Sequence, residues 1–117
     1  MKEIPQASEI SNEIQGNGRK LVIFDWDDTL FPTTVLKQYV EHTSLIAYFR
    51  HRYSQALSLL DQSLINLFSE LRDHNQSEII ILSNATQAWL DYTFTFLPMF
   101  NKYLKTSGLR VVSAQDQ

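Results

Sequence analysis

Two short apolar runs, each ending in polar side chains, constrain the fold of this chain more than any other feature. Residues 21–24 (LVIF) lead directly into Asp25, and residues 79–82 (IIIL) lead directly into Ser83. A run that is apolar at every position and rich in β-branched residues is typical of a strand buried within a parallel sheet. The runs therefore predict two such strands, each covered on both faces.

Leucine and phenylalanine recur at helical spacing between the two runs. The positions follow the i, i+3, i+4, i+7 pattern of a helix with one buried face: Leu57, Leu60, Leu64, Phe68 and Leu71. This pattern predicts a long amphipathic helix over 54–73, with a start as early as Ser44 left open. Pro32 suits a first helical turn and predicts a shorter helix over 33–41.

Cap and turn signals divide the rest of the chain into two helices and a third strand. Asn84, with glutamine three residues later, resembles a capping pair and predicts a helix that begins at the next residue. Pro98 interrupts this helix and opens another over 99–106, which Gly108 is expected to end. Residues 109–112 (LRVV) then predict a third strand.

The order strand, helix, strand, helix, strand predicts right-handed crossovers within one parallel sheet. We therefore expect an α/β fold with a Rossmann-like three-layer parallel sheet of three strands. A length of 117 residues suits one domain, which we place at 19–117. Residues 1–18 are largely polar and end in a Gly-Asn-Gly sequence, so we expect a flexible N-terminal tail there.

Composition excludes several classes of function. The net charge is −3 and no long basic run occurs, so no nucleic-acid partner is expected. The absence of cysteine excludes disulfides and thiolate chemistry. No apolar stretch approaches the length of a membrane span, and the first residues lack the apolar core of a secretory signal. We expect a cytoplasmic protein without a membrane partner.

Carboxylates gather where the first strand is expected to end. Asp25, Asp27 and Asp28 follow the first run, and Ser83 follows the second. In an open parallel sheet, ligands bind beyond the carboxyl ends of the strands, so these groups are expected at one edge. Clustered carboxylates repel one another, and a hard cation such as Mg²⁺ relieves that repulsion while it attracts phosphate oxygens.

These groups suit phosphoryl transfer. One carboxylate can attack phosphorus and form an aspartyl-phosphate, while a second acid two residues away protonates the leaving oxygen. The Ser83 hydroxyl and the N–H groups that begin the next helix can bind the phosphate oxygens. Ser83 also reads as a plain helix cap, and the two roles are compatible.

The same residues carry a resemblance to a known family. Residues 25–30 (DWDDTL), after an apolar strand, resemble motif I, DxDx[TV][LV], of the haloacid dehalogenase (HAD) superfamily. Residues 79–84 (IIILSN) resemble its motif II, an apolar strand that ends in serine or threonine. The string FDWDDTLFPT, followed by SNATQAWLDYT, LP and VVSA, is similar to a little-characterised branch found in protists and plants.

The resemblance implies a role for each matching residue. Asp25 would be the nucleophile and a magnesium ligand, and Asp27 would be the general acid and base with its carbonyl on the metal. Ser83 would hold the phosphoryl group of an unidentified phosphorylated substrate. Backbone amides of three residues would assist it: Trp26, Asp27 and Asn84. Thr29 would brace the turn through local hydrogen bonds.

The family pattern has two further parts that this sequence lacks. They are a lysine, motif III, and an acidic pair that completes the magnesium site, motif IV. Lys102 and Lys105 precede the third strand and read as solvated helix positions, and the sequence ends at Gln117. We therefore expect a truncated chain with little activity alone, whose first strand has an exposed edge open to self-association or to a partner chain.

Other interpretations stay open at this point. The chain is alternatively a degenerate, non-catalytic domain that acts as a protein-interaction module. Separately, the three acids also read as only a capped, solvated turn. A phosphoacceptor receiver domain ranks last, because it needs an aspartate after the third strand, where Ser113 stands. A calcium loop counted from Asp25 would place Leu30 where glycine is required. The Trp26 side chain either lines the pocket or packs in the core.

Overall fold

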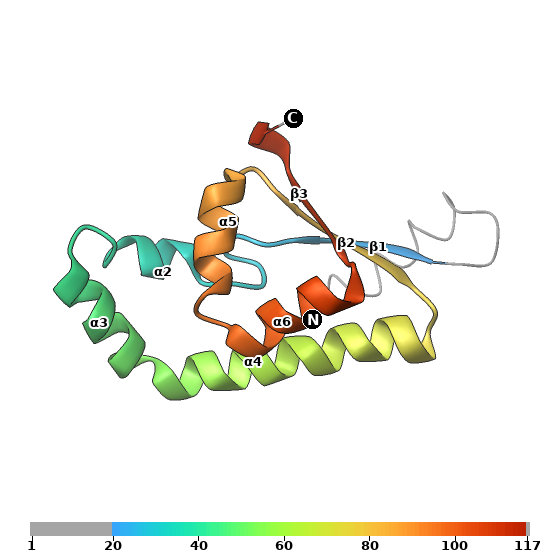
Figure 1. Ribbon diagram of the computed structural model, residues 1–117, viewed down its shortest axis with the longest axis horizontal. Coiled ribbons are helices and arrows are strands. Elements are labelled where there is room, and N and C mark those ends of the chain that lie inside the picture. Colours follow the sequence, from blue (N-terminus) through green and yellow to red (C-terminus); the bar gives the residue numbers. More distant parts are fainter. Residues whose placement is uncertain (1–19, 117) are drawn as a thin grey trace.

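The computed structural model describes residues 20–116, so the tail expected at 1–18 lies outside the described part of the chain. The described residues form a three-stranded parallel sheet and five α-helices (Figure 1). The strands are β1 (Leu21–Asp25), β2 (Glu78–Ser83) and β3 (Arg110–Ser113). The predicted α/β class is confirmed, and each strand lies within one residue of its predicted ends.

The two apolar runs lie side by side. β1 pairs with β2 in parallel from their first residues as far as Asp25, which stands opposite Leu82. β2 pairs with β3 in the same direction, and their last residues, Ser83 and Ser113, stand opposite each other. The strand order is β1-β2-β3, so β2 is the central strand of the described sheet.

The helices connect the strands in the predicted order. Between β1 and β2 lie α2 (Thr33–Lys37), α3 (Thr43–Arg52) and α4 (Ser54–Ser69), followed by a π-helical turn, η1 (Glu70–His74). Between β2 and β3 lie α5 (Gln87–Phe94) and α6 (Pro98–Ser107). The short 3₁₀ turn η2 (Ala114–Asp116) follows β3. No helix in this part of the chain is long and apolar enough to cross a bilayer.

Several helix boundaries differ from the predicted ones. α2 stops at Lys37 rather than at residue 41, and the long helix over 54–73 ends its regular α-helical part at Ser69, before the π turn. The extension toward Ser44 is a separate helix, α3, because Tyr53 leaves the helical path with φ −110° and ψ 21°. α5 begins at Gln87, two residues later than expected.

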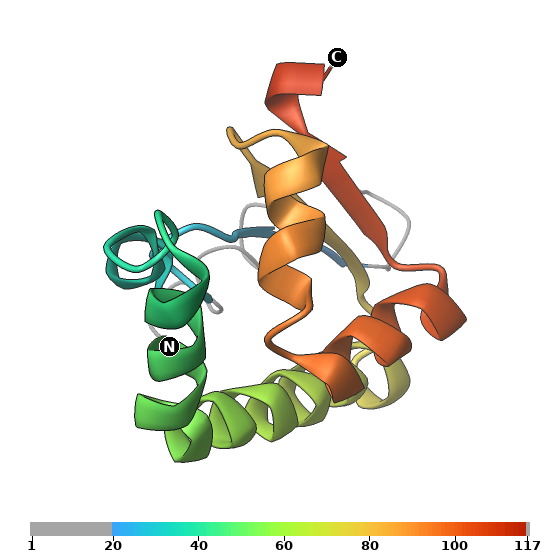
Figure 2. The same ribbon diagram turned by 60° about the vertical axis from the view of Figure 1, so that its left-hand side comes forward.

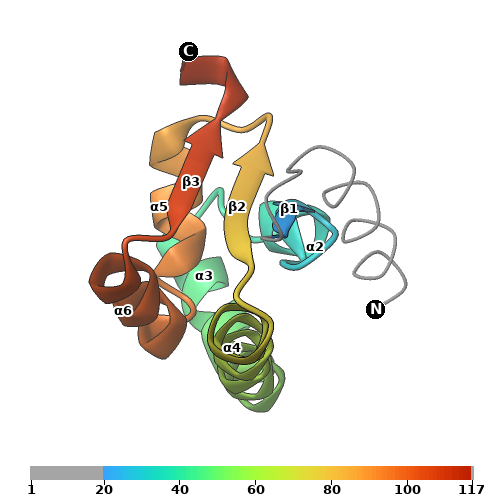
Figure 3. The same ribbon diagram turned by 90° about the vertical axis from the view of Figure 1, so that its right-hand side faces the viewer.

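Helices cover one face of the described sheet. Phe24 of β1 and Ile81 of β2 are buried, whereas Ile23 and Leu82, which point to the other face, keep 44% and 42% of their surface exposed. Figures 2 and 3 show α5 and α6 together on one side of β2 and β3. The expectation of three layers, with each strand covered on both faces, is therefore wrong for residues 20–116, which form two layers.

The direction of winding explains the two layers. Both crossovers run toward the same edge, from β1 to β2 to β3. Right-handed crossovers that advance in one direction place their helices on the same face of the sheet. A second helical layer arises where the winding reverses, at the switch point of a doubly wound sheet. The apolarity of a single strand carries no information about that direction.

The covered face packs on an aromatic core centred on Trp26. Its indole stacks on Phe31 and Phe100, with ring centroids 5.7 and 5.9 Å away, and meets Phe94 edge-on at 5.0 Å. Its Nε1–H donates to Thr93 Oγ1 at 2.9 Å, so the buried indole nitrogen has a partner. Of the two interpretations of this side chain, the structure shows the one in the core.

α6 is fixed at both ends. The buried Asp61 carboxylate of α4 accepts hydrogen bonds from the N–H groups of Met99 and Phe100, at 3.0 and 2.7 Å. Pro98 occupies the first turn, and Gly108 ends the helix with φ 69° in the left-handed region. The helix ends lie within one residue of the predicted 99–106, and Gly108 follows the helix as expected, but its carboxylate cap comes from a distant helix.

Candidate functional site

Polar side chains meet at the carboxyl edge of the sheet. Asp25 ends β1 and Ser83 ends β2, and the two strands are parallel neighbours. An open hollow of about 270 Å³ at this edge is lined by Ile23, Asp25, Leu82, Ser83 and Asn84. The structure thus brings the first acid and the hydroxyl to one place, as the two apolar runs predict.

A tight turn directly after β1 fixes the acidic residues. The Trp26 carbonyl accepts hydrogen bonds from the N–H groups of Thr29, Leu30 and Phe31, at 3.3, 3.0 and 3.1 Å. The Asp28 N–H donates to the Phe31 carbonyl at 2.7 Å. Asp28 has φ 60°, a left-handed conformation that aspartate adopts more readily than most residues. The backbone of the acidic segment is therefore held by its own hydrogen bonds.

Asp25 is an exposed acid of this segment. Side chains of β1 point alternately to the two faces of the sheet, so Asp25 points to the same uncovered face as Ile23. Thr29 Oγ1 donates to Asp25 Oδ2 at 2.8 Å and so orients the carboxylate from across the turn. An exposed and oriented carboxylate is suited to nucleophilic attack or to binding a cation.

Asp27 is half-buried and is held by three hydrogen-bond donors. Ser83 Oγ donates to its Oδ2 at 2.5 Å, while Thr33 Oγ1 and Trp89 Nε1 donate to its Oδ1 at 2.6 and 3.3 Å. These donors belong to β2, α2 and α5, so three elements position one carboxylate. The solvated-turn interpretation therefore does not describe this acid.

Asp28 supports the fold instead. Its carboxylate accepts from the Oγ1 and the N–H of Thr34, at 2.6 and 2.8 Å, in the first turn of α2. The Thr34 hydroxyl, then the Thr34 N–H and more weakly the charge of Lys37, hold the pKa of Asp28 below its usual value of 3.8. The capped-turn interpretation therefore applies to this acid.

Ser83 is buried at the end of β2 and bonds on both sides. Its Oγ donates to Asp27 and accepts the Ala85 N–H at 3.0 Å. It is thus both a local cap of the chain after β2 and a partner of the acid. Because a hydroxyl carries one proton, Ser83 must release Asp27 before it donates to a phosphate oxygen.

The predicted cap of α5 at Asn84 is wrong. Thr86 is the N-cap residue, and its side-chain oxygen accepts the Trp89 N–H at 3.1 Å. The helix starts later than expected because the residue before Thr86 still belongs to the turn that Ser83 caps. Asn84 is exposed and lines the hollow instead.

Three residues around Asp27 were not predicted as site residues: Thr33, Lys37 and Trp89. The Lys37 Nζ lies 5.4 Å from the centroid of the Trp89 ring, and that ring donates to Asp27. Thr33 and Lys37 are four residues apart and so share one face of a helix. This spacing is the sequence pattern that could have placed Lys37 near Thr33. Trp89 is 62 residues from Asp27, and no local pattern connects the two.

The oxygens at this edge fit a hard cation in part. Asp25 offers an exposed carboxylate, and Mg²⁺ takes one or two carboxylates together with waters and phosphate oxygens. Among residues 20–116, no group of three or more acidic, histidine or cysteine side chains is placed to hold a metal ion. The described residues would therefore supply the Asp25 carboxylate, and other oxygens would complete the shell.

A scan against protein-family models, a search of curated proteins and a search of solved structures each gave no match to this chain. The resemblance of residues 25–30 and 79–84 to the HAD motifs therefore stays a prediction. The functional assignment depends on the geometry of the sheet edge itself.

Proposed function

We propose that the chain carries a phosphatase-type, HAD-like site that hydrolyses phosphate esters with magnesium through an aspartyl-phosphate. The observation that carries the proposal is the hydrogen bond between Ser83 and Asp27 at the edge where Asp25 is exposed. Asp25 and Ser83 line one hollow, and Asp27 is hydrogen-bonded to Ser83, so the proposed nucleophile, phosphate ligand and acid-base group lie close together. The substrate is a phosphorylated compound of unidentified structure.

Asp25 is the group placed to attack. One of its carboxylate oxygens forms a bond to phosphorus while the bond from phosphorus to the substrate oxygen breaks. Protonated Asp27 gives its proton to that leaving oxygen. In the second step Asp27 takes a proton from a water molecule that attacks phosphorus, which frees Asp25 and inorganic phosphate. Mg²⁺, when bound, offsets the negative charge of the carboxylate and the phosphate.

The network around Asp27 links substrate binding to proton transfer. When Ser83 turns its hydroxyl toward a phosphate oxygen, Asp27 Oδ2 loses a donor. Thr33 and Trp89 still hold Oδ1, so the carboxyl group keeps its orientation. Phosphate binding therefore releases one oxygen of the acid while the other stays anchored.

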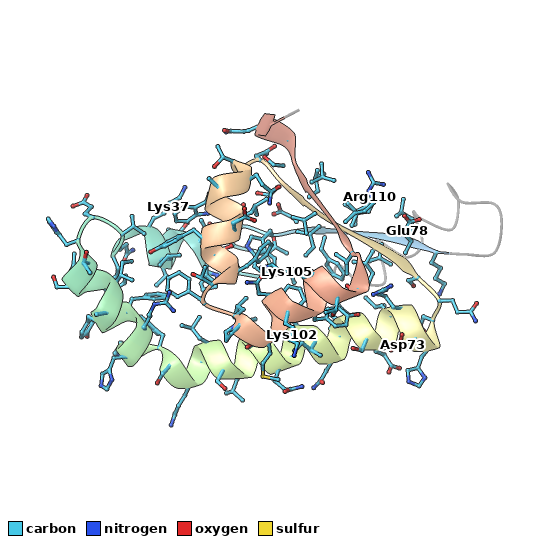
Figure 4. The ribbon with its side chains drawn as sticks, in the orientation of Figure 1. Lys37, Asp73, Glu78, Lys102, Lys105 and Arg110 are labelled. Carbon is cyan, nitrogen blue, oxygen red and sulfur yellow. The ribbon has the colours of Figure 1, made fainter. Side chains whose placement is uncertain are left out.

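Hydrolysis of an aryl phosphate with Mg²⁺ tests the role of Asp25. We expect a low rate from this chain, because the described residues supply only part of a metal shell, and a further loss of at least about tenfold in Asp25→Asn. Asp73→Asn is the matched control, since Asp73 is exposed on η1, far from the edge (Figure 4). Equal rates for wild type and Asp25→Asn would remove Asp25 from the mechanism.

A second candidate function is a non-catalytic interaction module. The exposure of Ile23 and Leu82, which line the same hollow, favours it, because contiguous apolar surface on an uncovered sheet face commonly marks an interface. β1 also pairs with β2 alone among the described strands, which leaves one edge for pairing with a second copy of the chain. A stable dimer in light scattering that binds no Mg²⁺ would favour this function over the first.

A further inference from the structure

Lys37 places a positive charge beside the acid-base network. It follows Thr33 by four residues on α2, and Thr33 bonds Asp27. The two side chains therefore project from one face of the helix. The Lys37 Nζ lies over the Trp89 ring, 5.4 Å from its centroid, and Trp89 donates to the same carboxylate. Figure 4 shows Lys37 close to α5, on which Trp89 lies.

No carboxylate of residues 20–115 lies within 4.0 Å of the Lys37 ammonium. The ion pair found at that distance in this part of the chain joins Glu70 and His74. Asp28 experiences its charge at longer range, but the Asp28 oxygens bond Thr34. A cation–π contact leaves the charge of a lysine intact. Lys37 therefore carries a positive charge that an incoming anion can use.

A phosphate group entering the hollow meets a negatively charged edge. The Asp25 carboxylate lines the hollow, and the Asp27 and Asp28 carboxylates follow within three residues. Each carboxylate repels a phosphate dianion. Ser83 contributes a neutral hydroxyl, which offers a hydrogen bond but no compensating charge. A cationic side chain near this edge would therefore strengthen phosphate binding beyond what a metal ion supplies.

We propose that Lys37 binds the phosphate group of a phosphate monoester by moving from the Trp89 ring to the phosphate oxygens. This inference rests on the proposed function, because it assumes phosphate in the hollow that Asp25 lines. Lys37 is exposed, and a cation–π contact is weak at an exposed site. Its stem is flexible, so the ring is a resting position from which the ammonium can reach its ligand.

Isothermal titration calorimetry of inorganic phosphate in the presence of Mg²⁺ measures the contribution of Lys37. Lys37→Met removes the charge and keeps the stem, and we expect about tenfold weaker binding. Lys37→Arg keeps the charge and should stay within about threefold of wild type. Lys102→Met is the matched control, because Lys102 is an exposed lysine on α6 (Figure 4), and its affinity should equal that of wild type.

Tryptophan fluorescence gives a second readout that a purely structural role would not affect. The chain has two tryptophans, and Trp26 is fully buried in the core. Phosphate should therefore change the emission of Trp89 as the ammonium leaves its ring. Saturating phosphate should cause a smaller change in Lys37→Met, which has no ammonium to move.

The outcomes separate this inference from the proposed function. Equal phosphate affinities for folded wild type and Lys37→Met would overturn the role of Lys37 and leave the proposed function standing. If folded wild type binds no phosphate at millimolar concentration, both proposals are wrong. Weaker binding by Lys37→Met, recovery in Lys37→Arg and an unchanged Lys102→Met would support the role of Lys37.

Discussion

Three aspartates within four residues have three different surroundings in this protein. Asp25 is exposed and oriented by Thr29, Asp27 is held by donors from three elements, and Asp28 bonds the first turn of α2. The sequence predicts that the acids gather at the edge of the sheet. It does not separate their roles, because Ser83 lies 56 residues from Asp27 along the chain and the other donors lie on helices.

Replacing Asp28 with asparagine should lower the free energy of unfolding at neutral pH. The pKa of Asp28 is lowered in the folded chain, so its stabilisation is complete above its usual value of 3.8 and is lost as the pH falls through the lower folded-state pKa. The stability difference between wild type and Asp28→Asn should therefore shrink on acidification. Urea unfolding at a series of pH values measures it, and a difference that grows toward low pH would contradict the assignment.

Strands and helix ends that a short sequence pattern marks were predicted well. Helix ends that depend on contacts with residues far along the chain were not. β1 and β2 follow from their apolar runs. Gly108 ends α6 because glycine, which has no side chain, readily adopts the left-handed conformation found there. The break between α3 and α4 falls at Tyr53, where no glycine or proline marks it. The start of α5 depends on which side chain caps it, and Asn84 and Thr86, two residue types that suit a cap, lie two positions apart.

The junction of α4 and α6 depends on a single carboxylate. Asp61→Ala should lower the free energy of unfolding by about 1–3 kcal/mol, because the Met99 and Phe100 N–H groups lose their acceptor. Asp61→Asn should cost less, since it keeps one acceptor oxygen. The exposed Ser63 of α4 offers a control, and Ser63→Ala should stay within about 0.5 kcal/mol of wild type by urea denaturation. An equal loss in Asp61→Ala and Ser63→Ala would exclude the proposed anchor.

The described chain as a whole is a sheet with helices on one face. An apolar strand predicts burial on both faces, yet what covers a face is decided by the direction of winding and not by the strand. The candidate site lies where the two faces meet, since Asp25 follows the uncovered face and Ser83 the covered one. Its hollow is open partly because Ile23 and Leu82 have no helix above them in this part of the chain.

Adjacent residues of β2 should respond very differently to truncation. Ile81 is fully buried, so Ile81→Ala should cost about 2–5 kcal/mol of unfolding free energy. Leu82 is 42% exposed on the uncovered face, so Leu82→Ala should cost about 1 kcal/mol or less. Chemical denaturation of the two variants compares the faces directly. Similar losses at both positions would show that the second face is buried in solution.

Trapping the covalent intermediate tests the central claim most directly. The chain is incubated with a small phosphoryl donor and Mg²⁺, and intact-mass spectrometry with peptide mapping locates any phosphoryl group. We predict one phosphoryl group on Asp25 in wild type and in Asp73→Asn, and none in Asp25→Asn. A phosphoryl group that appears equally in Asp25→Asn, or a folded wild-type chain that never acquires one, would contradict the assignment of Asp25 as the nucleophile.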